Sequence, residues 1–186
     1  MKTGLIVVDV QNDYFTGGSM ELVNMDAAAA NCARLLEFFR KQEIEIFHMQ
    51  HIATREGATF FVANTSGSEI HESVKPQADE AVIVKHYPSC FRETELAEML
   101  KQAAVQELVI CGAMTHMCID TTTRAAFDLG FQCHVIADAC ATRDLEFNGR
   151  LVGAADVQAA FMAALSMPFA RISSTDQFLG VDVVDA

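Results

Sequence analysis

Three residues with reactive side chains each stand at or shortly after the end of a short apolar run in this 186-residue chain. Asp9 closes the run GLIVVD, Lys85 closes AVIVK, and Cys118 follows LVICG. A thiol attacks a carbonyl as its thiolate, while a neighbouring carboxylate takes its proton and an ammonium stabilises the charge. Brought together, these three side chains could carry out nucleophilic acyl transfer.

The segment around Cys118 has the pattern of a strand, a turn and a helix. The β-branched run of residues 108–110 turns at Gly112 and resumes as a helical pattern that ends at Gly130. The first turn of a helix offers unpaired N–H groups and the positive end of the helix dipole. Both favour thiolate over thiol, so the pattern predicts a lowered pKa for Cys118. The alternative is a buried cysteine without a role, because free cysteine is among the most buried residue types.

Apolar runs alternate with helical patterns along the rest of the chain, which predicts a mainly parallel sheet with helices on both faces. The expected strands are 4–9, 44–49, 81–85, 107–111, 131–137 and 169–172. The expected helices are 26–41, 94–104, 148–165 and the one that follows Cys118. The long segment 51–78 is predicted to form a functional cover or binding loop, and the acidic tail after Gly180 is expected to be loose.

In open α/β sheets, ligands bind beyond the carboxyl ends of the strands. Asp9, Lys85 and Cys118 are therefore expected to meet at one rim of the sheet. A buried carboxylate or ammonium is costly unless it is paired, so Asp9 and Lys85 are predicted to form an ion pair. The alternative is an ion pair that serves only the structure of the sheet edge.

The composition restricts the class of protein and its partners. The length fits one domain over residues 1–186, and the mean hydropathy of +0.20 indicates that some apolar surface lies in a subunit interface. A net charge of −12 without a Lys/Arg cluster argues against nucleic acid and anionic membranes as partners. No apolar run is long enough to span a bilayer, and the N-terminal residues read as a strand rather than a signal peptide.

The six cysteines are irregularly spaced, which predicts reduced thiols and a cytoplasmic location rather than a disulfide framework. None of them forms a CxxC pair, so a structural zinc site is not expected. Cys90 and Cys140 are expected in loops, without a nearby cation.

The segments LIVVDVQNDYFTGGS, VIVKHYPSCF and VICGAMTHMCIDTTTRAAFDLGF resemble the signature segments of the isochorismatase-like cysteine hydrolases. That superfamily includes nicotinamidases, N-carbamoylsarcosine amidohydrolases and isochorismatases, and the resemblance covers residues 4–142. It implies a Rossmann-like three-layer α/β/α fold with a mainly parallel sheet of order 3-2-1-4-5-6. It also implies that the subunits pair near the active site as a homodimer or homotetramer.

The same resemblance assigns roles to individual residues. It implies that Asp9, Lys85 and Cys118 form the catalytic triad. It further implies a non-proline cis peptide between Ala113 and Met114, which aims the backbone N–H groups of Met114 and Cys118 at an oxyanion.

Nicotinamidases, within that superfamily, bind a metal through an Asp-x-His pair after the second strand and a further histidine. This chain has HMQHIAT at the first place and Phe60-Phe61 near the second. His48 and His51 have a spacing that directs them to opposite faces of a strand. We expect one packed and one loop-exposed histidine, and neither a metal nor any other cofactor.

The sequence thus predicts a metal-independent cysteine hydrolase that cleaves an amide or ureide C–N bond of a small molecule through a thioester. Tyr14, Phe60 and Phe61 are candidates for its substrate pocket, because aromatic residues are typical of small-molecule sites. One alternative is vinyl-ether hydrolysis of the isochorismatase type, although the resemblance implies that such enzymes often lack the cysteine. Another is a non-catalytic binding protein in which Cys118 is a reactive thiol. Turnover of an amide distinguishes them.

Overall fold

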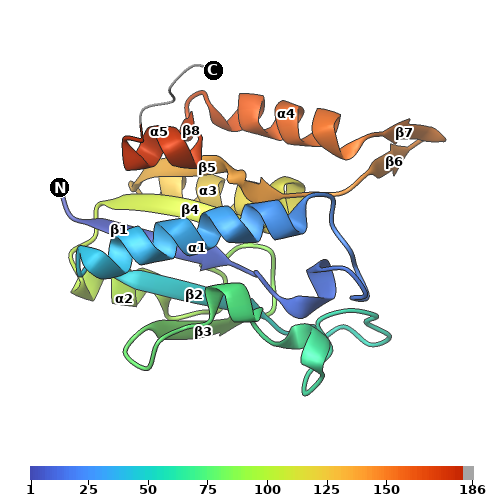
Figure 1. Ribbon diagram of the computed structural model, residues 1–186, viewed down its shortest axis with the longest axis horizontal. Helices are drawn as coiled ribbons and strands as arrows, with labels where there is room; N and C mark the ends of the chain where they lie inside the picture. The colour runs from blue at the N-terminus through green and yellow to red at the C-terminus, as the bar shows by residue number, and fades with distance from the viewer. Residues whose placement is uncertain (182–186) are drawn as a thin grey trace.

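The computed structural model describes residues 1–181, so the acidic tail beyond Val181 lies outside the described residues. A six-stranded parallel sheet forms the middle layer, in the order β3-β2-β1-β4-β5-β8, with helices on both sides (Figure 1). The predicted fold class and strand order 3-2-1-4-5-6 are confirmed. The sixth strand of the sheet is β8, because β6 and β7 form a separate hairpin.

The strands of the sheet are Thr3–Val8 (β1), Ile46–His51 (β2), Ala81–Lys85 (β3), Glu107–Ala113 (β4), Gln132–Ala141 (β5) and Arg171–Ser173 (β8). The antiparallel hairpin consists of Leu145–Phe147 (β6) and Arg150–Val152 (β7). The α-helices are Met25–Lys41 (α1), Leu96–Gln102 (α2), Asp120–Asp128 (α3), Ala154–Leu165 (α4) and Thr175–Leu179 (α5). Within residues 1–181, no helix combines the length and the hydropathy that crossing a membrane requires.

Successive residues of each central strand face opposite helical layers. Leu5 and Val7 of β1 pack with α1 and α5 on one face, whereas Ile6 and Val8 pack with α2, α3 and α4 on the other. A strand covered on both faces is apolar throughout, which is why β1 and β4 read as uninterrupted runs. The carboxyl ends of these strands meet on the right of Figure 1, below the protruding hairpin.

The prediction of a helix over 148–165 is wrong for residues 148–153, because α4 begins at Ala154. Asn148 and Gly149 both have positive φ, at 51° and 72°, and they join β6 to β7. Asn-Gly is a preferred two-residue turn between antiparallel strands, because both residues tolerate the left-handed region. The chain therefore makes a hairpin before α4 begins at Ala154.

Strand β5 continues beyond its expected end at residue 137, and it reaches Ala141. The continuation is possible because its pairing with β4 shifts register between Ile110 and Gly112 and then resumes with Gly112 opposite Cys140. Cys140 consequently lies in a strand and not in a loop.

Gly112 lets β4 approach β1 closely just before the segment that carries Cys118. Its φ is +119°, and a Cβ atom there would lie 2.0 Å from the carbonyl oxygen of Val8. Only glycine adopts this conformation without strain at such a distance.

We expect Gly112→Ala to lower the free energy of unfolding by about 3–5 kcal/mol, because the backbone of a central strand must move. Gly149→Ala is the matched control, since its φ is also positive but nothing lies within 4 Å of the added Cβ. That control should cost about 1 kcal/mol. Urea unfolding of both variants measures the difference, and equal midpoints would contradict it.

Candidate active site

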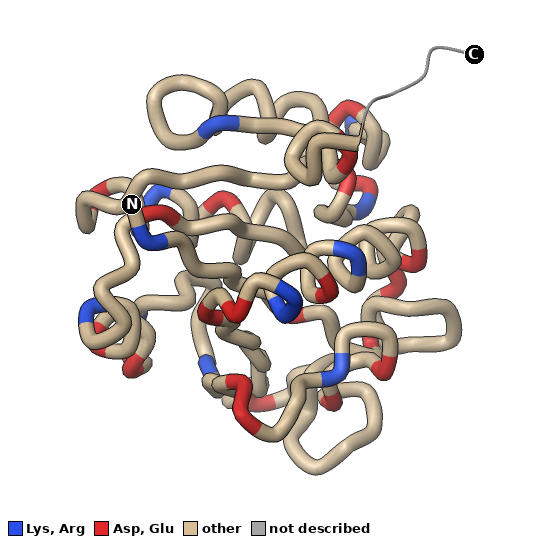
Figure 2. Tube along the Cα trace, turned by 60° about the vertical axis from the view of Figure 1, so that its left-hand side comes forward, with Lys and Arg blue, Asp and Glu red and all other residues tan. Residues whose placement is uncertain are grey.

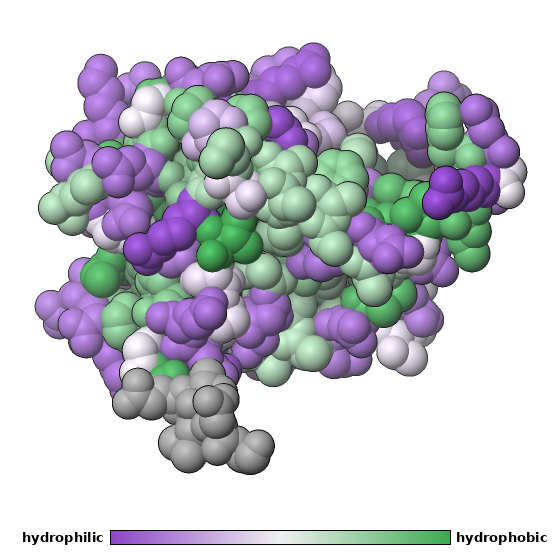
Figure 3. Space-filling view, turned by 90° about the horizontal axis from the view of Figure 1, so that it is seen from above, coloured by the Kyte–Doolittle hydropathy of each residue, from purple (hydrophilic) through white to green (hydrophobic). Residues whose placement is uncertain are grey.

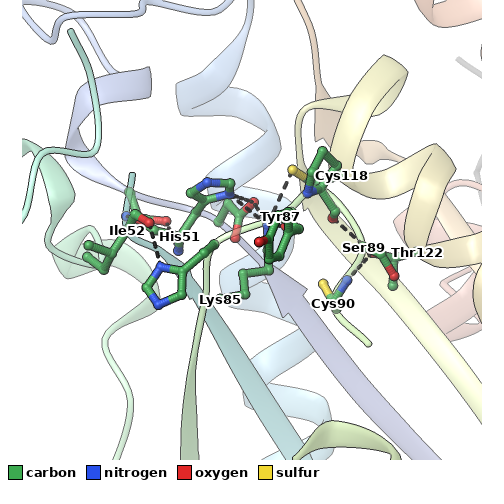
Figure 4. A network of polar contacts seen from close by, with 12 residues as sticks. His51, Ile52, Lys85, Tyr87, Ser89, Cys90, Cys118 and Thr122 are labelled. Carbon is green, nitrogen blue, oxygen red and sulfur yellow. Dashed lines mark hydrogen bonds and ion pairs between the residues drawn. The ribbon is translucent and has the colours of Figure 1, made fainter. Parts of the chain in front are cut away.

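Four neighbouring strands each bring one side chain to the same rim of the sheet (Figure 4). Lys85 is the last residue of β3, His51 is the last residue of β2, and Asp9 follows β1 directly. Cys118 follows β4 in a short π-helical turn, Thr115–Ile119, that leads into α3. The structure therefore brings the three predicted residues together and adds His51.

The ammonium of Lys85 is the centre of this cluster. Its Nζ lies 2.7 Å from Asp9 Oδ2, and the side chains of both residues are fully buried. It also lies 3.0 Å from His51 Nδ1, 3.1 Å from the carbonyl oxygen of Tyr87 and 3.3 Å from Cys118 Sγ. Burial is the largest single effect and disfavours the ammonium, but the charges of Asp9, Cys118 and Cys90 and the hydrogen bond to Asp9 together outweigh it, so the pKa of Lys85 is raised. The lysine is therefore a permanent cation among four acceptors.

Asp9 adopts an unusual backbone conformation for a residue with a side chain. Its φ is +50°, in the left-handed region. Within residues 1–181 its carboxylate oxygens have no hydrogen-bond partner apart from the ion pair with Lys85. A left-handed backbone together with a buried carboxylate that has one lysine as its sole partner in the described chain is typical of a functional site.

Cys118 is 4% exposed, and its pKa differs from the sequence prediction. Burial raises the pKa of Cys118, Asp9 raises it further, and only Lys85 opposes them, so the net shift is upward. The predicted lowering is wrong because the loss of hydration outweighs the field of the helix start. The resting cysteine is a thiol and must lose its proton to a neighbouring group before it can attack.

The peptide between Ala113 and Met114 is cis. The carbonyl oxygen of Met114 accepts the N–H groups of Met117 and Ile119, at 3.0 and 3.2 Å. These bonds fix the start of the π-helical turn. The assignment of the Met114 and Cys118 N–H groups to an oxyanion hole stays a prediction.

The expectation of one packed and one loop-exposed histidine is wrong for the second of them, because His48 is buried and His51 is the last residue of β2. Its side chain is 18% exposed, and the buried Gln11 holds its backbone through two hydrogen bonds. Gln11 Oε1 accepts the His51 N–H at 2.7 Å, and Gln11 Nε2 donates to the His51 carbonyl oxygen at 2.9 Å. Burial and the charge of Lys85 lower the pKa of His51 to about 4, so its imidazole is neutral near pH 7. Because Lys85 donates to Nδ1, the ring proton is on Nε2.

The metal-ligand pattern of nicotinamidases does not fit this chain. His48 is buried, and its Nε2 lies 2.9 Å from Glu80, which is also paired with Arg40 of α1 at 2.6 Å. His48 is thus engaged on the α1 side of the sheet, whereas His51 faces Lys85. The two histidines cannot bind one ion.

The three aromatic pocket candidates form one cluster beside the site. Phe61 lies 4.6 Å from Tyr14 and 5.0 Å from Phe60 between ring centroids, and 5.8 Å from His51. Phe61 has a φ of +55°, and its N–H donates to the buried Asp13 carboxylate at 2.6 Å. Phe61 therefore holds the covering segment against the catalytic rim.

Tyr14 lies close enough to the site to sense its charges. Burial raises the pKa of Tyr14, Cys118 and Asp9 raise it further, and Arg143 opposes them. Burial and Arg143 also lower the pKa of His116. Arg143 therefore lies near Tyr14 and His116, just beyond the carboxyl end of β5.

Arg143 is a second residue that the sequence reasoning missed. Its Nε is buried and has no hydrogen-bond partner among residues 1–181. A guanidinium with an unpaired nitrogen near the pocket candidate Tyr14 can bind an anionic group of a ligand. Its position just after β5, the strand next to β4 in the sheet, could have identified it as a site residue.

Comparison with known proteins gives a consistent picture. A family model described as an isochorismatase domain matches residues 3–177. The isochorismatase family protein YddQ of Bacillus subtilis, itself uncharacterized, is 49% identical over 96% of this chain and 99% of its own length. A streptothricin hydrolase of Streptomyces noursei is 35% identical over 76% of this chain and 50% of its own. A crystal structure from Oleispira antarctica, described as an isochorismatase hydrolase, superposes with a TM-score of 0.93 at 49% identity and covers 96% of both chains.

Lys85→Met should raise the apparent pKa of Cys118 further, because the nearby cation favours the thiolate and Asp9 opposes it. The rate of alkylation of Cys118 against pH measures the shift, which belongs to the coupled group rather than to one residue. Lys41→Met is the control, since Lys41 pairs with Glu37 on the exposed surface. A profile in Lys85→Met that matches the control would contradict the contact.

Proposed function

We propose that this chain, which belongs to the isochorismatase family of hydrolases, cleaves the C–N bond of a small amide or ureide through a thioester on Cys118. The observation that carries the proposal is the contact of Cys118 Sγ with the Lys85 ammonium, at 3.3 Å, while the same ammonium pairs with Asp9 at 2.7 Å. A nucleophile, a base and a fixed cation within one buried cluster are the components that acyl transfer requires.

The reaction begins with the thiol. Asp9 takes the proton of Cys118, and the Lys85 ammonium stabilises the resulting thiolate in place of the carboxylate. Lys85 keeps its positive charge through this step. The negative charge that moves from Asp9 to Cys118 therefore stays paired with it. The thiolate then attacks the substrate carbonyl. The N–H groups of Met114 and Cys118 stabilise the tetrahedral oxyanion, and each contributes about 3 kcal/mol.

Collapse of the tetrahedral intermediate breaks the C–N bond, and the leaving amine takes the proton from Asp9. Water then attacks the thioester, Asp9 accepts a proton from it, and the acid product leaves as Cys118 regains a proton. No step uses a metal, because the Lys85 ammonium supplies the positive charge.

A compact substrate suits the site, since Asp9, Lys85 and Cys118 are all buried. The unpaired Arg143 guanidinium favours a substrate that carries a carboxylate or another anionic group. Hydrolases for streptothricin and nicotinamide occur among the relatives, which supports C–N bond chemistry for this fold. A panel of amides and ureides, each with and without a carboxylate, tests both features through release of ammonia or amine.

The same panel of substrates distinguishes two alternative functions. A vinyl-ether hydrolase would release no amine and would act without Cys118. A thiol-bearing binding protein would react once per chain and would not turn over.

Cys118→Ala should fold normally and lose turnover by about 10³-fold or more, because the covalent route disappears. Cys118→Ser should be nearly as inactive, since a carboxylate is too weak a base to ionise an alcohol efficiently. Cys133→Ala is the control, because Cys133 is also buried but no charged side chain shifts its pKa. Amine release measures all three, and turnover by Cys118→Ala would remove Cys118 from the mechanism.

We also propose that the chain forms a homodimer or homotetramer. Phe147 and Leu151 of the protruding hairpin are 77% and 66% exposed, and Figure 3 shows apolar surface gathered beside that hairpin. A lone two-stranded hairpin is marginally stable, so packing against a second chain would support it.

The Lys and Arg residues of the described chain are scattered among more numerous Asp and Glu (Figure 2), which offers no basic face to a nucleic acid.

Light scattering at micromolar concentration should therefore give at least twice the mass of one chain. The double variant Phe147→Asp/Leu151→Asp should shift the protein toward the monomer, because it places charge on the apolar hairpin. A monomeric wild-type protein would contradict the assembly.

A further inference from the structure

We propose that Asp9, His51 and Cys118 form a three-ligand site for a thiophilic divalent cation such as Zn²⁺, and that Lys85 keeps the metal out by placing its ammonium there. The proposal goes beyond the hydrolase reaction, because it concerns the affinity of the site for metal rather than turnover.

The three side chains have the spacing and the donor types of a zinc site. One ligand atom from each residue, an oxygen, a nitrogen and a sulfur, lies within 4.8 Å of the other two. Bonds from zinc to such atoms are about 2.0–2.3 Å long, so tetrahedral ligands stand roughly 3–4 Å apart. A movement of about 1 Å would thus close the three ligands around an ion.

The Lys85 Nζ already occupies the position that such an ion would take. It contacts Asp9 Oδ2 at 2.7 Å, His51 Nδ1 at 3.0 Å and Cys118 Sγ at 3.3 Å. The carbonyl oxygen of Tyr87, at 3.1 Å, completes a set of four acceptors. An ammonium has three N–H groups, so it cannot donate to all four acceptors at once. Four acceptors around one cation resemble the four-coordinate binding of a metal ion.

The orientation of His51 is also suited to a metal. Its Nδ1 faces the lysine nitrogen at 3.0 Å, where a metal would need a ligand atom. The two hydrogen bonds from Gln11 to the His51 backbone hold this ligand in place.

Lys85 and a dication exclude each other, because both would occupy one buried position with like charges. The cluster is moreover a different ligand set from the Asp-x-His pattern of nicotinamidases, since it consists of the proposed nucleophile, its base and a histidine. A metal bound there would take both the nucleophile and the base, so removal of the ammonium would produce a metal-bound, inactive protein.

The test is zinc binding by the full chain as Lys85→Ala and as Lys85→Val, which has a β-branched side chain suited to β3. Competition with a chromophoric chelator should give one Zn²⁺ per chain, bound on the order of 100-fold more tightly than by the wild type. Co²⁺ in the same variants should show thiolate-to-cobalt charge-transfer absorption, which identifies a sulfur ligand.

The double variants Lys85→Ala/His51→Ala and Lys85→Ala/Cys118→Ala should lose this binding, whereas Lys85→Ala/Cys133→Ala should keep it. Zinc should also protect Cys118 from alkylation in Lys85→Val, and leave it reactive in the wild type at the same concentration. Equal zinc affinity in wild type and variants, or binding that survives loss of His51 and of Cys118, would overturn the proposal. These readouts need no substrate, so they stand or fall independently of the hydrolase activity.

Discussion

The buried ion pair between Asp9 and Lys85 is the interaction on which the rest of the site depends. Both side chains are fully excluded from solvent, at 2.7 Å from each other. Removal of either partner would leave a buried charge uncompensated, which costs several kcal/mol. The pair also links strands that are not neighbours, because β2 lies between β1 and β3. The ammonium must therefore pass the end of β2, and the residue there has to tolerate it. A neutral histidine accepts its N–H, whereas a cation would repel it and a carboxylate would compete with Asp9.

Much of this arrangement could be predicted from the sequence, because both-sided burial makes central strands uniformly apolar. The runs that end at Asp9 and Lys85 and the glycine turn before Cys118 were sufficient to place three side chains on one rim. The strand order 3-2-1-4-5-6 then requires β2 and β5 to end at that rim as well. His51 and Arg143 were missed because the predicted ends of these strands fell two and four residues early. The pKa of Cys118 could not be read from the pattern, since its burial comes from segments distant in sequence.

The stretch from Asp9 to Asp13 restricts how substrate preference can change in chains of this kind. Alternate residues of this short stretch serve the proposed catalytic base, the strand that carries His51 and the aromatic cover. Gln11 bonds both His51 and the carbonyl oxygen of Ser68, and Asp13 bonds the N–H of Phe61. Gly67 packs so tightly on Asp13 that a Cβ would lie 2.2 Å from its carboxylate. The cover is thus held to the catalytic stretch by bonds from the Gln11 and Asp13 side chains to its backbone, and by the close packing of Gly67. New substrate preferences can arise by exchanging exposed side chains of the cover, while insertions or deletions between its anchor points would also disturb the catalytic base.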